Sequence, residues 1–368
     1  MKFCDFLNLI GIKNLNKERF EDWNLSKRRL EIIEKIKSSE KNIVIWGASS
    51  GGKGVLKFIR DLGKEANYFV DIDKNKQGKV LEGIKIFPPS NIGENDFVLI
   101  GSIFEDEISR FLEDMNVEYV KDIIYILNFE TPLFNFSILN NHLEELSAVF
   151  NLLSDKESKM VFSSYIKYIL TTSPLHIQRS KYKQYFHPLV RPEKGDIIVD
   201  GGAFNGDTAC EFLTYEPHIK KIYSFEPDNE NFLELVHNCK DKRVVAIKKG
   251  LWSENKELTF NCGRGSGSYI GAGNKNTTKI QAVSLDSFFK DKALPDLIKL
   301  DIEGSELEAL KGAREIINKK QPKLQISLYH EPLHLFKIPL FLKAINPNYK
   351  FYLGHHSGLF MELVLYAI

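Results

Sequence analysis

Two strand ends in the C-terminal half of the chain carry the residue types that a nucleoside-binding site requires. The run from Asp196 to Thr208 is Asp-Ile-Ile-Val-Asp-Gly-Gly-Ala-Phe-Asn-Gly-Asp-Thr, so an apolar strand ends in Asp200 and breaks into a glycine-rich turn. A second apolar strand, residues 222–225, ends in Glu226. In a parallel α/β sheet, such a turn lets the backbone approach a nucleoside, and the second carboxylate accepts hydrogen bonds from ribose hydroxyls. Together, these segments predict one nucleoside-binding site.

Three more polar residues follow later strands and could act on a substrate. Asp301 ends the apolar strand 297–300, Glu303 stands two residues later, and His330 ends the strand that begins at Lys323. A carboxylate at such a position can take a proton from a hydroxyl group or hold a divalent cation, and imidazole has a suitable pKa for the same proton transfer. Each residue also has a structural explanation: a solvated strand end, a helix N-terminus that favours carboxylates, or a satisfied histidine. Both explanations stay open here.

A second glycine-rich turn lies nearer the N-terminus, after the apolar strand 43–46. Residues 47–54 match most of the phosphate-binding pattern G-x-x-x-x-G-K, but Gly54 stands where a magnesium-binding Ser or Thr is needed. Asp71, at the end of the next strand, is well placed for a ribose hydroxyl. An ATPase, a nucleotide or sugar-nucleotide site, and a degenerate Rossmann-like scaffold are the competing explanations. We favour the scaffold, because any α/β protein needs tight strand-to-helix turns.

The apolar runs divide the chain into four parts. Residues 1–40 are charged and helix-favouring, and residues 41–128 alternate strands with helices, which predicts a small parallel Rossmann-like α/β domain. Residues 129–192 predict a helical connector or cap. Residues 193–368 predict a second, larger α/β domain, whose last two strands have no long helix between them and should be antiparallel. The aromatic and basic segment 179–187 fits a solvated amphipathic helix better than a substrate-facing lid.

Composition and charge exclude several classes of protein. The chain has 368 residues, and its 50 basic and 49 acidic residues leave a net charge of +1, so nothing draws the whole chain to nucleic acid or to an anionic membrane. The four cysteines are scattered, which indicates a reduced protein. The first residues lack a signal-peptide pattern, and no stretch reaches the ~20 apolar residues of a membrane helix. We therefore expect a cytoplasmic protein without membrane insertion.

The later part of the chain carries short motifs in a fixed order. After Asp200, the positions of the pattern acidic-x-Gly-x-Gly-x-Gly are held by Gly202, Phe204 and Gly206, and Phe204 argues against a dinucleotide pyrophosphate there. The other matching segments are Phe225-Glu226-Pro227, Val283-Ser284-Leu285-Asp286, Ile298-Lys299-Leu300-Asp301-Ile302-Glu303-Gly304-Ser305-Glu306, Leu310-Lys311-Gly312-Ala313, and Pro322 with Tyr329-His330. With these motifs, residues 196–330 resemble the FkbM family of S-adenosylmethionine-dependent methyltransferases.

This resemblance implies a fold and an activity. The fold is a Rossmann-like class I methyltransferase sheet with an antiparallel last strand; residues 41–128 look more weakly like a small Rossmann-type domain that precedes the methyltransferase in some bacterial surface-sugar enzymes. The implied activity is transfer of a methyl group from S-adenosylmethionine to a hydroxyl of a small acceptor, a sugar or surface-glycan component. Similar sugar and polyketide O-methyltransferases use a carboxylate at the position of Asp301 with magnesium, so Asp301 and Glu303 are the metal candidates.

The residues expected at the site fall into two groups. Asp301, His330 and Glu303 are expected to be catalytic, either as bases or as orienting groups. Glu226 is expected to accept both ribose hydroxyls of the cofactor, and the adenine is expected near Gly250 and Leu251. The full set of expected cofactor contacts is Asp200, Gly201, Gly202, Ala203, Asn205, Gly206, Thr208, Glu226, Pro227 and Ser253.

Other functions are weighed against this one. A catalytically inactive scaffold protein, binding a nucleotide or sugar nucleotide in the N-terminal domain, is disfavoured by the intact set of strand-end carboxylates. A nucleic-acid methyltransferase is disfavoured by the neutral charge and by the absence of an Asn-Pro-Pro-aromatic motif. A nucleotide-sugar dehydrogenase lacks a convincing hydride-transfer site near residues 47–71.

The loop 263–269, with Arg264, is either a substrate-side loop or, as we favour, a plain turn. The expected partner is a small carbohydrate acceptor, and a homo-oligomer stays open.

Overall fold

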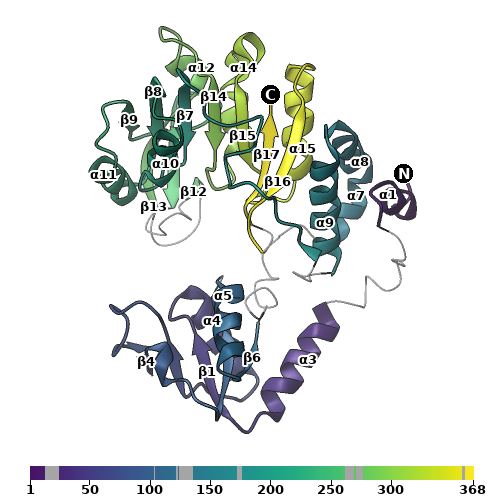
Figure 1. Ribbon diagram of the computed structural model, residues 1–368, viewed down its shortest axis with the longest axis vertical. Helices are drawn as coiled ribbons and strands as arrows, with labels where there is room; N and C mark the ends of the chain where they lie inside the picture. Colours follow the sequence, from purple (N-terminus) through teal and green to yellow (C-terminus); the bar gives the residue numbers. More distant parts are fainter. Residues whose placement is uncertain are drawn as a thin grey trace. The chain divides into compact units, whose positions relative to one another are not determined.

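The chain folds into two compact units (Figure 1). Met1–Leu15 and Phe134–Ile368 form the C-terminal unit, and Asn16–Leu133 form the N-terminal unit. The predicted segment 1–40 is therefore divided, because helix α1 (Phe3–Leu9) belongs to the C-terminal unit and helix α3 (Leu25–Ser38) to the N-terminal unit. The computed structural model describes residues 1–12, 25–102, 104–121, 123, 136–171, 176–261, 269–270, 277–358 and 361–368. The loop 263–268, predicted as a turn, lies outside these residues.

The N-terminal unit is built on a six-stranded sheet with the order β3-β4-β2-β1-β5-β6. All its strand pairs are parallel except β3 with β4, as expected for a small Rossmann-like domain. Its elements after α3 are β1 (Asn42–Trp46), α4 (Ser50–Asp61), β2 (Tyr68–Val70), β3 (Val80–Leu81), β4 (Ile84–Phe87), η1 (Pro89–Asn91), β5 (Asp96–Ile100), α5 (Glu105–Asp114) and β6 (Glu118–Val120).

Strand β1 is covered on both faces. Ile43 and Ile45 belong to an apolar cluster that includes residues of α4, and Val44 and Trp46 belong to a separate cluster that includes residues of α5. Successive side chains of a strand point to opposite faces of its sheet. A run of four apolar residues is therefore what a central strand with helices on both sides requires.

The C-terminal unit is built on a seven-stranded sheet with the order β16-β17-β15-β14-β7-β8-β9. Its strands are parallel except β17, which runs antiparallel to both β15 and β16. This confirms the predicted methyltransferase-type sheet with an antiparallel last strand. The strands are β7 (Ile197–Gly201), β8 (Lys221–Phe225), β9 (Val244–Ile247), β14 (Leu297–Leu300), β15 (Lys323–Ser327), β16 (Phe351–His355) and β17 (Leu363–Ala367).

Helices and a small second sheet complete this unit. The small sheet has the order β10-β13-β11-β12, from β10 (Gly250–Leu251), β11 (Lys256–Asn261), β12 (Tyr269–Ile270) and β13 (Thr277–Val283). The helices after β7 are α10 (Asp207–Tyr215), α11 (Asn229–Asn238), α12 (Leu285–Phe288), α13 (Glu306–Lys311), α14 (Arg314–Lys320) and α15 (His334–Ile345). Among the described helices of the whole chain, none has the length and apolar character to cross a membrane.

The connector before β7 closes the open edge of the large sheet. Its helices are α7 (Phe136–Asn141), α8 (Leu143–Leu152) and α9 (Lys156–Thr171), and α9 lies beside edge strand β16 (Figure 1). Ser154 and Ser158 accept hydrogen bonds from the backbone N–H groups of Phe351 and Leu353, at 3.1 and 2.9 Å. These bonds satisfy edge groups that would otherwise be open to another strand.

The segment 179–187 was predicted as a solvated amphipathic helix, and this prediction is wrong. The segment has no helical turn, and its Tyr185 and His187 are buried. The N–H of Ser180 donates to the carbonyl oxygen of His355, and the N–H of Tyr185 donates to the hydroxyl of Tyr366. The spacing of aromatic and basic residues indicated a helix, but the aromatic rings pack on strands β16 and β17 instead. Local spacing does not encode such long-range contacts.

Loss of one serine hydroxyl at this edge should destabilise the C-terminal unit. Ser158 and Leu353 are each 2% exposed, so Ser158→Ala leaves the Leu353 N–H buried without this acceptor. We expect the free energy of unfolding to fall by about 1–3 kcal/mol. Urea denaturation, followed by Trp252 fluorescence in a Trp23→Phe/Trp46→Phe background, measures this unit. Ser163→Ala, on the same helix and bonded only to the Lys159 carbonyl in that helix, is the control. Equal stability of the two variants would contradict the expectation.

Candidate active site

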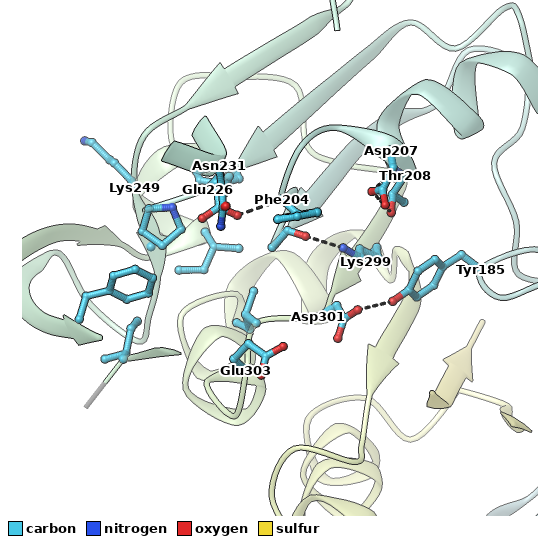
Figure 2. A pocket seen from close by; sticks show the side chains of 18 of the residues that line it. Tyr185, Phe204, Asp207, Thr208, Glu226, Asn231, Lys249, Lys299, Asp301 and Glu303 are labelled. Carbon is cyan, nitrogen blue, oxygen red and sulfur yellow. Dashed lines mark hydrogen bonds between the residues drawn. The ribbon is translucent and has the colours of Figure 1, made fainter. Parts of the chain in front are cut away.

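A cavity of about 280 Å³ opens at the carboxyl ends of β7, β8 and β14 (Figure 2). Gly202 follows β7, Glu226 follows β8, and Asp301 follows β14, and all three line the cavity. Parallel strands of one sheet end at the same edge, which is where ligands bind in open α/β folds. Glu226 and Asp301, two of the strand-end carboxylates that the sequence singled out, thus share one cavity.

The glycine turn after β7 is required by close packing. Gly202 has a φ of +73°, and a Cβ atom there would lie 1.8 Å from the carbonyl oxygen of Asp301. Gly206 has a φ of +88°, and its Cβ would lie 2.4 Å from the Sγ of Cys239. Glycine has no Cβ atom and adopts positive φ values without strain, so it is the residue that fits both positions. Phe204, between them, lines the cavity and occupies the middle of the three positions that are glycine in the sequence pattern.

Two thiols lie beneath this turn. Cys210 and Cys239 are free cysteines whose Sγ atoms are 2.7 Å apart, and the Sγ of Cys239 donates to the carbonyl oxygen of Gly206 at 3.1 Å. Sequence spacing gave no sign of this pair, because the residues stand on different helices, α10 and the end of α11. The thiols therefore support the turn from below.

Glu226 is held in place by the backbone. Its side chain is almost buried, with the residue 5% exposed, and it accepts hydrogen bonds from the N–H groups of Phe204 and Asp228, both at 2.9 Å. Burial raises the pKa of the Glu226 carboxyl to about 7, and the two N–H bonds only partly offset it. The remaining lone pairs of the carboxylate face the cavity, where they can accept further hydroxyl hydrogens.

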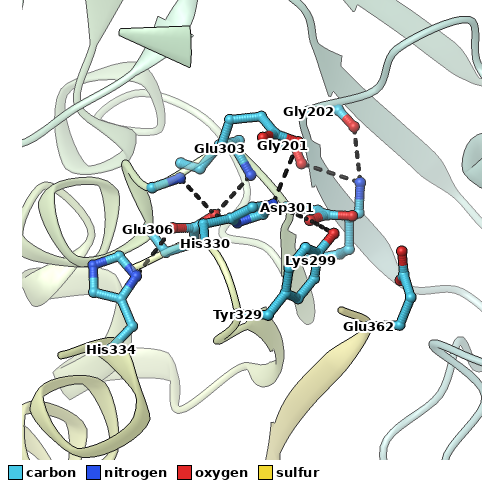
Figure 3. Close-up of polar contacts among 12 residues, drawn as sticks. Gly201, Gly202, Lys299, Asp301, Glu303, Glu306, Tyr329, His330, His334 and Glu362 are labelled. Carbon is cyan, nitrogen blue, oxygen red and sulfur yellow. Dashed lines mark hydrogen bonds and ion pairs between the residues drawn. The ribbon is translucent and has the colours of Figure 1, made fainter. Parts of the chain in front are cut away.

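Beneath the turn, Lys299 and Asp200 form a buried ion pair. Their side chains are 2% and 0% exposed, and the Lys299 Nζ lies 3.0 Å from the Asp200 Oδ1. The same ammonium donates to the carbonyl oxygens of Gly201 and Gly202, at 3.1 and 2.9 Å (Figure 3). Burial disfavours the ammonium, yet the negative charges of Asp200 and Asp301 raise the pKa of Lys299 above its usual value. Asp200 thus positions Lys299, and Lys299 clamps the turn.

Asp301 is held ionised on the other side of the cavity. The hydroxyl of Tyr185 donates to its Oδ2 at 2.7 Å, and the hydroxyl of Tyr329 donates to its Oδ1 at 3.2 Å (Figures 2 and 3). Burial opposes the charge, but the cations of His330 and Lys299 outweigh it and lower the pKa of Asp301. A charged, oriented carboxylate is therefore available at the end of β14.

His330 is a cation held among three carboxylates (Figure 3). Its Nδ1 lies 2.7 Å from Glu306, and its Nε2 lies 3.3 Å from Glu303 and 3.5 Å from Asp301. Burial favours the neutral ring, but Glu306, Glu303 and Asp301 together raise the pKa of His330 well above its usual value. An imidazolium has no free lone pair, so His330 is unsuited to the role of base that the sequence suggested for it.

The donor set does not fit a magnesium ion. Ligand atoms of Asp301, Glu306 and His330 lie within 4.8 Å of one another. However, the Oε1 of Glu306 already accepts from the backbone N–H of Ile302 at 2.9 Å, and His330 supplies the positive charge at the centre of the group. Magnesium prefers oxygen ligands that keep open lone pairs. The protonated histidine thus holds the place that the predicted ion would need.

Backbone strain gathers at the same cavity. Tyr185, Phe204, Glu303 and Glu362 have φ values between +45° and +67°, and all four line it. Only three other described non-glycine residues have a positive φ. Left-handed backbone is costly for residues with a Cβ and tends to persist where function requires a set geometry. Its concentration here supports this cavity as the functional site.

The structure places the predicted site residues in three positions. Gly202, Thr208, Glu226, Pro227, Asp301 and Glu303 line the cavity. Asp200, Gly201, Ala203 and Gly206 are buried behind them. Asn205, Ser253 and His330 do not line it, although Gly250 and Leu251, near the expected adenine position, do.

Sequence reasoning missed three residues of the site. Lys299 stood within a quoted motif but received no role. Tyr185 stood in the segment that was read as a solvated helix, and its partner Asp301 is 116 positions away. Glu362 follows no recognisable pattern, and burial raises its pKa to about 7. A buried lysine beside a strand-end aspartate was the one available signal, since lysine is seldom buried without a partner.

Comparison with known proteins agrees with this geometry. Residues 200–349 match the family model of the methyltransferase FkbM domain, and residues 39–124 match a model described as C2185-like, N-terminal. The hexuronic acid methyltransferase AglP of Haloferax volcanii is 28% identical over 131 residues, which cover 34% of this chain and 52% of that protein. This chain thus spans about half the length of that relative.

A solved structure shows the same fold along the chain. The crystal structure of methyltransferase FkbM from Methylobacillus flagellatus has a TM-score of 0.68 with 18% sequence identity, and the match covers 99% of this chain and 98% of that one. The cavity at the ends of β7, β8 and β14 therefore lies within residues 200–349, the part of the chain that matches the methyltransferase FkbM domain model.

Proposed function

We propose that the C-terminal unit transfers a methyl group from S-adenosylmethionine to a hydroxyl group of a small sugar acceptor. One observation carries this proposal: two carboxyl groups with different properties line the same cavity. Glu226 is suited to bind a ribose, and Asp301 is ionised and held in a fixed orientation. S-adenosylmethionine supplies the methyl group on a sulfonium, which is a good leaving group. The tasks left to the protein are alignment of the two reactants and removal of the hydroxyl proton.

The cofactor side of the cavity has the features that an adenosyl ligand requires. Glu226 has lone pairs for the ribose hydroxyls, and the wall beyond it is formed by Leu251, Phe260 and Ile270, which suit an adenine ring. The side chain of Phe204 occupies space that a pyrophosphate would need, which favours a cofactor without phosphate. Lys299 fixes the carbonyl groups of the turn against which the methionine part would lie.

The acceptor side of the cavity is formed by polar groups around Asp301. Tyr185, Tyr329 and Glu303 surround this carboxylate, and Glu362 lines the same cavity. Asp301 is positioned to accept the proton of the acceptor hydroxyl, while His330 balances the negative charge of the carboxylates behind it. Hydroxyl and carboxyl groups suit a polyhydroxylated ligand, and AglP, the relative described above, is named for a sugar acid substrate. A sugar acceptor is the class that both observations support.

Cofactor affinity should depend on the charge of Glu226. In the free protein the pKa of Glu226 is raised to about 7, so its carboxyl group becomes ionised as the pH rises through that value. The ribose hydroxyls donate hydrogen bonds, and they therefore bind better to the ionised form. We expect S-adenosylhomocysteine affinity to fall by up to about tenfold as pH is lowered from about 8 to about 6. Calorimetry on wild type and Glu226→Gln measures this, and Glu226→Gln should bind weakly at both values.

The matched control for this titration is Glu362→Gln. Burial raises the pKa of the Glu362 carboxyl to about 7 as well, but this residue follows the loop before β17 and contacts Gln184. The pH dependence should persist in Glu362→Gln. If it disappears there and remains in Glu226→Gln, the assignment of Glu226 to the ribose is wrong.

Removal of the Asp301 charge should stop the reaction without removing the cofactor. We expect Asp301→Asn to lower kcat by about 10²–10⁴-fold, because the hydroxyl proton loses its acceptor. The Kd for S-adenosylhomocysteine should stay within about tenfold of the wild-type value. Turnover is measured as S-adenosylhomocysteine released with a panel of sugar acceptors, and binding by calorimetry. A large loss of cofactor binding would instead assign Asp301 to cofactor recognition.

Methyl transfer should not require a divalent cation. The protonated His330 already provides the positive charge beside Asp301, and the Oε1 of Glu306 is held by His330 and by the N–H of Ile302. We expect equal initial rates after dialysis against excess EDTA and after addition of magnesium. A rate that collapses in EDTA and returns with magnesium would show that His330 gives way to a metal ion in the working enzyme.

A further inference from the structure

The N-terminal unit has a cavity of its own, which the proposed methyl transfer does not use. Its volume is about 850 Å³, and Trp46, Asp71 and Gly101 line it at the carboxyl ends of β1, β2 and β5. Strand β1 lies between β2 and β5, so the chain turns to opposite sides of β1 at this point. Ligands of open α/β sheets bind where the strand order reverses in this way, and sites for small molecules typically measure about 300–1,000 Å³.

Apolar side chains stand open at this cavity. Ile72 is 73% exposed and Phe104 is 61% exposed, and both line it from different loops, one after β2 and the other before α5. The rings of Trp46 and Phe111 meet edge to face at 5.4 Å and line it as well. Large apolar side chains that gather at the mouth of a cavity indicate a ligand with a flat or apolar part.

A fixed charge lines the same cavity. Asp71 is 7% exposed, and its carboxylate accepts from the N–H groups of Ala48 and Asp73 and from the Lys76 ammonium, at 2.9, 2.9 and 3.0 Å. Burial opposes the charge, yet these bonds hold the pKa of Asp71 below its usual value. A carboxylate offers about four acceptor sites, so one stays open for a hydroxyl hydrogen. A lipid tail would gain nothing from this ionised group.

The glycines of the turn have two different explanations. A Cβ atom at Gly47 would lie 2.8 Å from the carbonyl oxygen of Gly101, and one at Gly52 would lie 1.9 Å from the carbonyl oxygen of Gly47, so packing within the unit requires both. Packing does not require Gly54, because a Cβ atom there would meet no atom within 4 Å. Its presence in helix α4 therefore needs another explanation, since glycine destabilises a helix. Gly54 lines the cavity and keeps its volume free.

We propose that this cavity binds a nucleotide. The base lies between Ile72 and Phe104, a ribose hydroxyl donates to Asp71, and the diphosphate group lies toward Lys76 and the first turn of α4. This arrangement matches a ligand that is flat at one end, carries hydroxyl groups in the middle and is anionic at the other end. A nucleoside diphosphate has this chemistry, whether free, in a nucleotide sugar or in a dinucleotide. The proposal is independent of the methyl-transfer site.

The test is calorimetry on the full chain with UDP, ADP, UDP-N-acetylglucosamine and NAD as probes. We expect at least one probe to bind. Gly54→Leu, which adds a bulky side chain to the wall of the cavity, should weaken that binding by about tenfold or more. Lys57→Leu adds the same side chain to an exposed position on α4, outside the cavity. This control also removes a positive charge, so retained affinity in Lys57→Leu would exclude a general electrostatic effect.

A second pair of variants tests the apolar walls. The double variant Ile72→Ala/Phe104→Ala should also weaken binding, whereas Val80→Ala, which alters a 60% exposed residue outside the cavity, should not. Circular dichroism of each variant checks that the unit is folded. Stronger binding of UDP-N-acetylglucosamine or NAD than of UDP or ADP identifies the form of the ligand. Absence of binding by all four probes, or binding that survives in Gly54→Leu and disappears in Glu226→Ala, overturns the proposal.

Discussion

The buried ion pair of Lys299 with Asp200 is the interaction on which the candidate active site depends. It links neighbouring strands β7 and β14, and the same ammonium holds two carbonyl groups of the turn that follows β7. Loss of one partner would leave the other charge buried and uncompensated, which typically costs about 3–5 kcal/mol. This glycine-rich turn also presents the N–H of Phe204, which donates a hydrogen bond to Glu226. One cation thus sets the geometry of the turn after β7 and, through Phe204, the position of Glu226.

The cavity keeps two carboxyl groups in different states by means of their surroundings. Glu226 is buried beside the backbone N–H groups of Phe204 and Asp228, and burial outweighs these bonds and raises its pKa to about 7. Asp301 is placed near Lys299 and the imidazolium of His330, which lower its pKa. Environments that push two similar groups apart in this way usually give them different roles. The same argument assigns His330 to charge balance, because its three carboxylate neighbours keep it protonated.

The two units use glycine-rich turns for different ends. In the C-terminal unit, Phe204 fills the position of the middle glycine, and the turn is clamped from below by Lys299. In the N-terminal unit, Gly47 and Gly52 are explained by contact between the turn, α4 and the loop after β5, whereas Gly54 lines the cavity without such a contact. Close packing thus accounts for Gly47 and Gly52, and it does not account for the open cavity beside them.

The sequence by itself determined the strands of the seven-stranded sheet, their order of appearance and the carboxylates at their ends, because apolar runs and strand-end positions are local properties of the chain. It therefore placed Glu226 and Asp301 at one edge of one sheet, which the structure confirms. Tertiary structure alone decided that Tyr185 donates to Asp301, that Glu362 joins the cavity, and that segment 179–187 packs on β16 and β17 without forming a helix. It also decided the charge of His330. These outcomes arise from contacts between residues far apart in the chain, and the free energy of such contacts depends on burial and neighbouring charge, which local spacing does not record.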